Sequence, residues 1–160
     1  MLEIVKSGPC AQLGSWGSLR DALCAAAELE RSGAEQYRCL AQRVGEPARG
    51  ILETLSADGM AHCQELEGVL RRSDLAAQID SPAAVRRRIV ALPSLPADPL
   101  EDDVLDYAEM REHLSFDMYD RMANLLAPGE LRELILRLCE RKRQREEEVR
   151  RCGSALFLIF

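Results

Sequence analysis

Apolar residues recur along four long stretches of the chain at the three- and four-residue intervals of an amphipathic helix. The stretches cover residues 18–44, 47–72, 99–126 and 130–152. In the second stretch the inward face is predicted to carry Ile51, Leu55, Gly59, His62, Leu66 and Val69. Each stretch is long enough for a helix that spans a whole domain, so the pattern predicts four long helices.

The predicted helix ends rest on capping and helix-breaking residues. Ser18 and Asp21 resemble a capping box at the start of the first helix, and Asp98 is placed to cap the third. Gly45 and Gly153 are placed to end the first and fourth helices. These signals fix the approximate bounds that the structure can test.

The connections between the helices differ in length. Gly45 and the Pro128-Gly129 pair mark short turns, whereas residues 73–99 form a long proline-containing connection with room for a short helix over 82–92. Short, long and short connections predict an all-α fold: an antiparallel four-helix bundle made of two helical hairpins joined by a crossover. Residues 1–17 are then an N-terminal extension, residues 18–153 the bundle, and residues 154–160 an apolar tail.

Composition narrows the class of protein. The chain has 160 residues, of which 47% are hydrophobic, 30% charged and 4% aromatic, which suits one helical domain. A net charge of -6 excludes nucleic acid as the expected main partner. The apolar tail is too short to span a membrane, and no signal peptide is recognised, so we expect a cytoplasmic protein. The six cysteines form no CxxC pair, which excludes a zinc knuckle or rubredoxin-type iron site.

The first and third helices share an internal repeat. In both, a carboxylate is followed by a small residue three positions later and by a tyrosine seven positions later, so that all three share one helix face. The two copies are Glu30, Gly33 and Tyr37, and Glu112, Ser115 and Tyr119. Both carboxylates lie on the apolar stripe, where a buried charge needs a cation or a proton as partner.

At these residues the sequence resembles the rubrerythrin branch of the ferritin-like family over roughly residues 18–152. Members of that family are four-helix bundles with a central di-iron site. Their first and third helices each carry a Glu followed by a small residue and a tyrosine, and their second and fourth helices each carry an ExxH motif. The resemblance implies that Glu30 and Glu112 match two of the metal ligands and that His62 matches the histidine of the second helix.

Three other ligand positions depart from the family pattern. Gly59 stands where the second helix would supply a bridging Glu, while Lys142 and Arg145 stand where the fourth would supply Glu and His. No rubredoxin-like module is present either. The resemblance therefore implies a degenerate di-iron site.

Positive charge at the site favours replacement of metal by ion pairs. We expect Lys142 and Arg145 to neutralise Glu112 and Glu30 and to exclude at least the second metal. The alternative is a rotated fourth helix, in which both cations reach solvent and Glu140 and Gln144 form the inward pair.

A single metal ion is the second hypothesis for the site. Asp58 lies one turn before His62, so these two with Glu30 could hold one iron, zinc or manganese ion, with Glu109 or Glu112 as a further oxygen ligand. The alternative is that His62 is an ordinary core histidine hydrogen-bonded to a neighbour. We place the reading with no cofactor first.

Three functional classes follow. The first is a ferritin-like bundle without di-iron redox catalysis, acting through its surface or as a homodimer. The second is a metal-binding ferritin-like protein, for which the resemblance implies iron- or peroxide-handling oxidoreductase activity. The third is an adaptor or cargo protein whose tail, residues 154–160, binds a protein partner. The residues favour the first.

Overall fold

The computed structural model describes residues 19–72 and 94–156, which form four helices. These are α1 (Leu19–Ala41), α2 (Ala48–Leu70), α3 (Glu101–Leu125) and α4 (Glu130–Leu156). The predicted helix over 82–92 and the extension 1–17 lie outside the described residues. The prediction of an all-α bundle with four long helices is confirmed.

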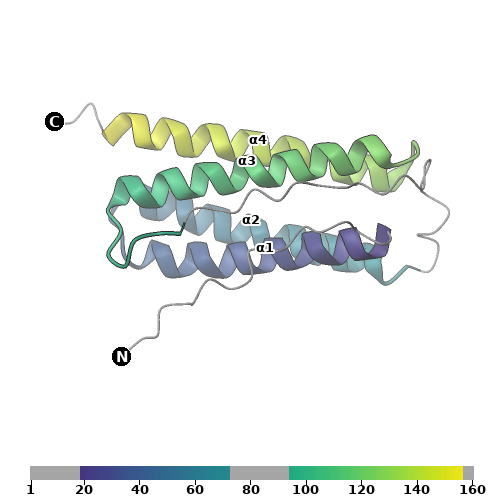
Figure 1. The fold of residues 1–160 in the computed structure, drawn as a ribbon, viewed down its shortest axis with the longest axis horizontal. Coiled ribbons are helices and arrows are strands. Elements are labelled where there is room, and N and C mark those ends of the chain that lie inside the picture. The colour runs from purple at the N-terminus through teal and green to yellow at the C-terminus, as the bar shows by residue number, and fades with distance from the viewer. Residues whose placement is uncertain (1–18, 73–93, 157–160) are drawn as a thin grey trace.

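The helices are arranged as two antiparallel hairpins packed face to face. Helix α1 packs along α2, and α3 packs along α4. Figure 1 shows that α2 and α3 run in the same direction, so the chain has to return along the length of the bundle between Leu70 and Glu101. This is the crossover topology that the unequal connections predicted.

The turn between α1 and α2 is closed by an arginine. Helix α1 ends at Ala41, earlier than the glycine at position 45 suggested, and Arg49 of α2 donates to the carbonyl oxygens of Ala41 at 3.2 Å and Val44 at 3.0 Å. A guanidinium thus satisfies carbonyl groups that the helix end leaves without a backbone partner.

The start of α3 differs from the prediction. Asp98 does not cap this helix but pairs with Arg43 at 3.6 Å, at the surface. The cap position is Leu100, whose backbone N–H donates to the Asp103 carboxylate at 2.9 Å. Asp103, in the first turn of α3, therefore provides the capping interaction that was expected of Asp98.

The end of α4 also differs. The helix continues through Gly153 to Leu156, so the prediction that Gly153 ends it is wrong. A glycine weakens a helix by about 1 kcal/mol but ends it only where the backbone turns left-handed. Among the described glycines only Gly129, in the turn before α4, has a positive φ. The predicted tail thus begins as the last turn of α4, and residues 157–160 lie outside the described part of the chain.

The core has two apolar clusters separated along the bundle axis by a polar layer. One cluster includes Leu23, Leu66, Met122, Ile135 and Leu138, and the other includes Leu52, Leu55, Val104, Leu105 and Val149. Six polar or charged side chains are buried between them or at their edges: Glu30, His62, Arg111, Glu112, Ser115 and Lys142. No helix in the described part of the chain is both long and apolar enough to cross a bilayer.

Candidate functional site

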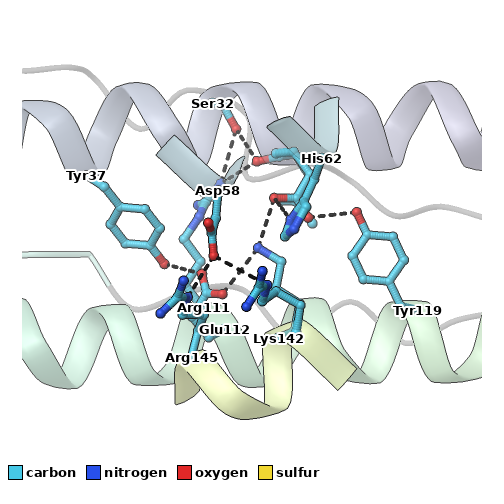
Figure 2. A network of polar contacts seen from close by, with 12 residues as sticks. Ser32, Tyr37, Asp58, His62, Arg111, Glu112, Tyr119, Lys142 and Arg145 are labelled. Atoms are coloured by element: carbon cyan, nitrogen blue, oxygen red, sulfur yellow. Dashed lines mark hydrogen bonds and ion pairs between the residues drawn. The ribbon is translucent and has the colours of Figure 1, made fainter. Parts of the chain in front are cut away.

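The centre of the polar layer is an ammonium group held between two carboxylates. Lys142 Nζ of α4 lies 2.9 Å from Glu30 Oε2 of α1 and 3.2 Å from Glu112 Oε2 of α3. All three side chains are at most 5% exposed. Lysine 142 therefore points inward, and one cation joins carboxylates from both hairpins (Figure 2).

The two tyrosines of the repeat cross between the hairpins. Tyr37 of α1 donates to Glu112 Oε1 of α3 at 2.7 Å, and Tyr119 of α3 donates to Glu30 Oε1 of α1 at 2.7 Å. Figure 2 shows the two rings on opposite sides of Lys142. Each carboxylate thus accepts from a tyrosine of the other hairpin and contacts Lys142 through its second oxygen. The repeat in the sequence becomes an approximate two-fold arrangement in space.

Ionisation of the site follows from its burial and its cation. Burial alone raises the pKa of Glu30, but the charge of Lys142, together with His62, outweighs it and lowers that pKa to about 2. Burial lowers the pKa of Lys142, but Glu112 and Glu30 outweigh it and raise that pKa above its ordinary value. Burial and the adjacent carboxylates raise the pKa values of Tyr37 and Tyr119 well above the ordinary range. The stable form at neutral pH therefore has ionised Glu30, charged Lys142 and neutral tyrosines.

His62 lies at the edge of this group. Its Nδ1 is 3.7 Å from Glu30 Oε2, which is too long for a hydrogen bond. That nitrogen is buried and has no hydrogen-bond partner among the described residues. His62 thus lacks, at Nδ1, the hydrogen bond that a satisfied core histidine would make there.

Arg145 has a different partner from the one expected. Its Nε donates to Asp58 Oδ2 at 2.7 Å, and a second nitrogen pairs with Glu148. The expectation that Arg145 joins Lys142 in neutralising Glu30 and Glu112 is thus corrected, because the guanidinium turns toward α2 instead. Glu140 is half exposed and pairs with Arg143 on the same helix, so the rotated register of α4 does not occur.

The remaining candidate ligands are also engaged in ion pairs. Asp58 is held by Arg145, and Glu109 pairs with Arg150 Nε at 2.8 Å on the outer side of α3 and α4. Within residues 19–72 and 94–156, no three His, Cys, Asp or Glu side chains are grouped so as to hold a metal ion. A divalent metal does not fit this donor set, since an ammonium lies between the two central carboxylates.

Gly59 marks a close approach of α1 and α2 beside the site. A β-carbon built on Gly59 would lie 3.1 Å from the Glu30 carbonyl oxygen and 3.2 Å from Ala34 Cβ. Nearby, Ser56 donates to the Ala34 carbonyl at 2.8 Å. Any side chain at position 59 would therefore begin in tight contact with the backbone and a methyl group of α1.

Arg111 is the buried residue that the sequence interpretation missed. Its side chain crosses from α3 to α1 and donates to Leu29 O at 2.9 Å, Ser32 Oγ at 3.2 Å and Gln36 Oε1 at 3.0 Å. In sequence it is one of many arginines in charged helical segments, with nothing local to mark it as buried. The signal in the sequence that could have indicated its burial was Gly33, a small residue that leaves space on α1 for a large side chain of α3.

One solved structure relates this architecture to a known fold. It is that of a Thermotoga maritima protein provisionally assigned as a ferritin-like diiron-carboxylate protein, matched with a TM-score of 0.71 over 86% of this chain and 95% of that one. The fold is ferritin-like. At 14% sequence identity the match shows the fold alone. No protein-family model and no curated protein matches the chain.

The ferritin-like fold places the site in the polar layer at the middle of the bundle. Every helix contributes to this layer, with Glu30 from α1, His62 from α2, Glu112 from α3 and Lys142 from α4. This layer can hold buried charged groups, position the tyrosine hydroxyls and fix how the two hairpins align along the bundle axis.

Proposed function

We propose that this chain is a ferritin-like bundle protein, of the rubrerythrin type, whose di-iron site is degenerate and which carries out no di-iron redox catalysis. The observation that carries the proposal is the position of Lys142 Nζ, 2.9 Å and 3.2 Å from the two carboxylates of the repeat. A cation that is part of the protein neutralises them in place of a metal.

Electrostatics supports this reading. Two ionised carboxylates attract one or two metal ions, but a fixed ammonium in contact with both supplies positive charge and repels a divalent cation. Arg145 acts in the same direction at a distance, since it neutralises Asp58, the nearest additional oxygen donor that the sequence suggested. At Gly59, where the family pattern has a bridging carboxylate, even an added β-carbon would be in tight contact with α1.

On this proposal the central polar layer is structural. It fixes how the two hairpins dock, and any biological activity belongs to the surface of the bundle or to its self-association as a homodimer in the cytoplasm. Buried ion pairs are better at specifying one arrangement than at adding net stability, which suits such a role.

The test is the metal content of the purified protein after exposure to Fe²⁺, Mn²⁺ or Zn²⁺. We expect less than one tenth of an equivalent of each. Lys142→Glu, which replaces the ammonium by a third carboxylate beside Glu30 and Glu112, should gain metal, whereas Arg143→Glu on the exposed side of α4 should not. Near-stoichiometric metal in the unmodified protein would overturn the proposal.

A second candidate function is supported by His62. A buried Nδ1 without a hydrogen-bond partner, 3.7 Å from a carboxylate oxygen, is the kind of atom that a single metal ion satisfies. On this reading Glu30 and His62 retain one iron, zinc or manganese ion, Lys142 turns away, and oxidoreductase activity toward peroxide becomes worth assaying. Metal that is present in the unmodified protein and absent in His62→Ala would favour it.

The adaptor hypothesis depends on residues 154–160, of which only the last turn of α4 is described. It stays a prediction. Removing these residues should abolish binding of a protein partner and leave the helical content unchanged.

A further inference from the structure

Arg111 buries a positive charge without a negative partner in contact. Its side chain is 5% exposed, and its three acceptors are a backbone carbonyl, a hydroxyl and an amide oxygen. No carboxylate of the described residues forms an ion pair with it. Burying a charge is costly unless an opposite charge compensates for it, so the hydrogen bonds explain its geometry and leave its charge unexplained.

The polar layer has the opposite imbalance. Glu30 and Glu112 bring two negative charges to the interior, and among the described residues Lys142 is the one cation in contact with both. Two carboxylates and one ammonium leave these three side chains with a net charge of -1. One further positive charge in the same layer brings the sum to zero.

We propose that Arg111 is this second cation: a positioning residue that balances the Glu30–Glu112–Lys142 cluster through its electric field, without touching either carboxylate. The inference rests on the proposed function, because it completes the set of internal cations that replaces metal. It assigns to Arg111 an electrostatic role beyond holding α3 against α1.

The placement of Arg111 supports this role. It directly precedes Glu112 on α3, and its guanidinium lies against Gly33 of α1, which is one helical turn from both Glu30 and Tyr37. Its charge counteracts burial and Glu112, which both raise the pKa of Tyr37, so its field reaches the hydroxyl that donates to Glu112. In an interior of low dielectric constant such a charge acts over several ångströms.

Gly33 makes this position possible. A β-carbon there would lie 2.8 Å from Arg111 Nε and 2.9 Å from Nη2. The small residue of the repeat thus opens the space that the guanidinium fills. Gln36 Oε1 accepts from Arg111 and, at 2.9 Å, from the Tyr107 hydroxyl, which fixes the amide in place.

The test is a double-mutant cycle read as the equilibrium constant for unfolding. If Arg111 balances the carboxylates, Arg111→Met should raise that constant at least thirtyfold in the unmodified protein and at most threefold in Glu112→Gln, where one negative charge is already gone. Arg111→Lys, which keeps the charge and loses the forked hydrogen bonds, should recover part of the loss. Glu109→Gln, a carboxylate on the outer side of α3, should leave the effect of Arg111→Met unchanged.

A loss of the same size in all three backgrounds would overturn the inference, because Arg111 would then act through its hydrogen bonds alone. If Arg111→Met fails to fold in every background, the cycle is repeated with Gly33→Ala, whose added methyl group displaces the guanidinium, and the same comparison decides. The metal measurement above is independent of this cycle. If Arg111 and Glu112 show no coupling and the protein binds no metal, only the role of Arg111 is rejected. If the protein binds stoichiometric metal, the proposed function itself is rejected.

Discussion

Gly59 of α2 lies so close to Glu30 of α1 that a β-carbon would come within 3.1 Å of the Glu30 carbonyl oxygen. The backbone of one helix thus occupies the place where a side chain of the next would project. The missing carboxylate at position 59 is therefore a change in helix packing as well as in chemistry, and restoring Glu there would force α1 and α2 apart.

Gly59→Ala tests this packing. An alanine normally favours a helix over glycine, but here the methyl group meets backbone, so we expect a loss of about 1–3 kcal/mol in the free energy of unfolding. Gly68→Ala, also in α2 and with nothing within 4 Å of its β-carbon, is the matched control and should gain about 0.5 kcal/mol. Urea denaturation of both variants measures the difference, and equal effects would contradict the close approach.

Lys142→Ala should be strongly destabilising. It leaves two buried carboxylates without their shared cation, which costs about 3–5 kcal/mol. Arg143→Ala removes the next basic side chain along α4, which is more than half exposed and pairs with Glu140, so it should cost less than about 1 kcal/mol. Thermal and urea denaturation give both values. A small effect for Lys142→Ala would mean that the lysine does not bridge the carboxylates in solution.

Neutralising the whole cluster should restore stability. In Lys142→Met with Glu30→Gln and Glu112→Gln, no charge of the triad remains to be stranded, so we expect this variant to be more stable than Lys142→Ala. Recovery should be incomplete, because Arg111 is then left without the negative charge that balances it. The amides still accept from the Tyr37 and Tyr119 hydroxyls. If the triple variant is as unstable as Lys142→Ala, packing around the lysine stem matters more than its charge.

Acid should unfold the protein partly through Glu30. The pKa of Glu30 is about 2 in the folded chain, against an ordinary 4.5, so its stabilising contribution is present above pH 4.5 and is lost as the pH falls toward 2. Glu30→Gln should therefore lower stability at pH 7 and flatten its decline between those two values. Urea midpoints measured across this range test the expectation, with Glu53→Gln on the exposed face of α2 as control.

Alkaline titration should separate the tyrosines. The chain has three, and burial beside carboxylates raises the pKa values of Tyr37 and Tyr119 well above the ordinary range. We expect these two to ionise only when the bundle unfolds, so that their phenolate absorbance rises together with the loss of helical circular dichroism. Phenolate formation by either in the folded protein would show that its hydroxyl is open to solvent.

The repeat made much of the fold and part of the site predictable. Identical spacing in two helices placed Glu30 and Glu112 on inward faces, an inference that needs only the 3.6-residue period. The lengths of the connections predicted the hairpins and the crossover topology. The resemblance to the rubrerythrin branch placed Lys142 opposite the two carboxylates.

The rest depends on how helices approach one another, which periodicity does not contain. The direction of Arg145 toward Asp58, the burial of Arg111 against Gly33 and the packing at Gly59 are all set by contacts between different helices. The hydrogen bonds that the two tyrosines donate to carboxylates of the opposite hairpin are also set by contacts between helices. The prediction that Gly153 ends α4 was wrong because the sequence does not distinguish a glycine inside a helix from a glycine at its end.

The crossed tyrosines also bear on how the molecule assembles. Neither hairpin supplies the tyrosine hydroxyl for its own carboxylate, since the hydroxyl for Glu30 comes from α3 and the hydroxyl for Glu112 comes from α1. The α1–α2 hairpin alone would leave Glu30 without Lys142 and without the Tyr119 hydroxyl. Sliding one hairpin along the other by one helical turn would separate both tyrosine–carboxylate pairs at once. The two hairpins are therefore expected to dock in one alignment, because any other alignment would leave the buried carboxylates and tyrosine hydroxyls without their partners.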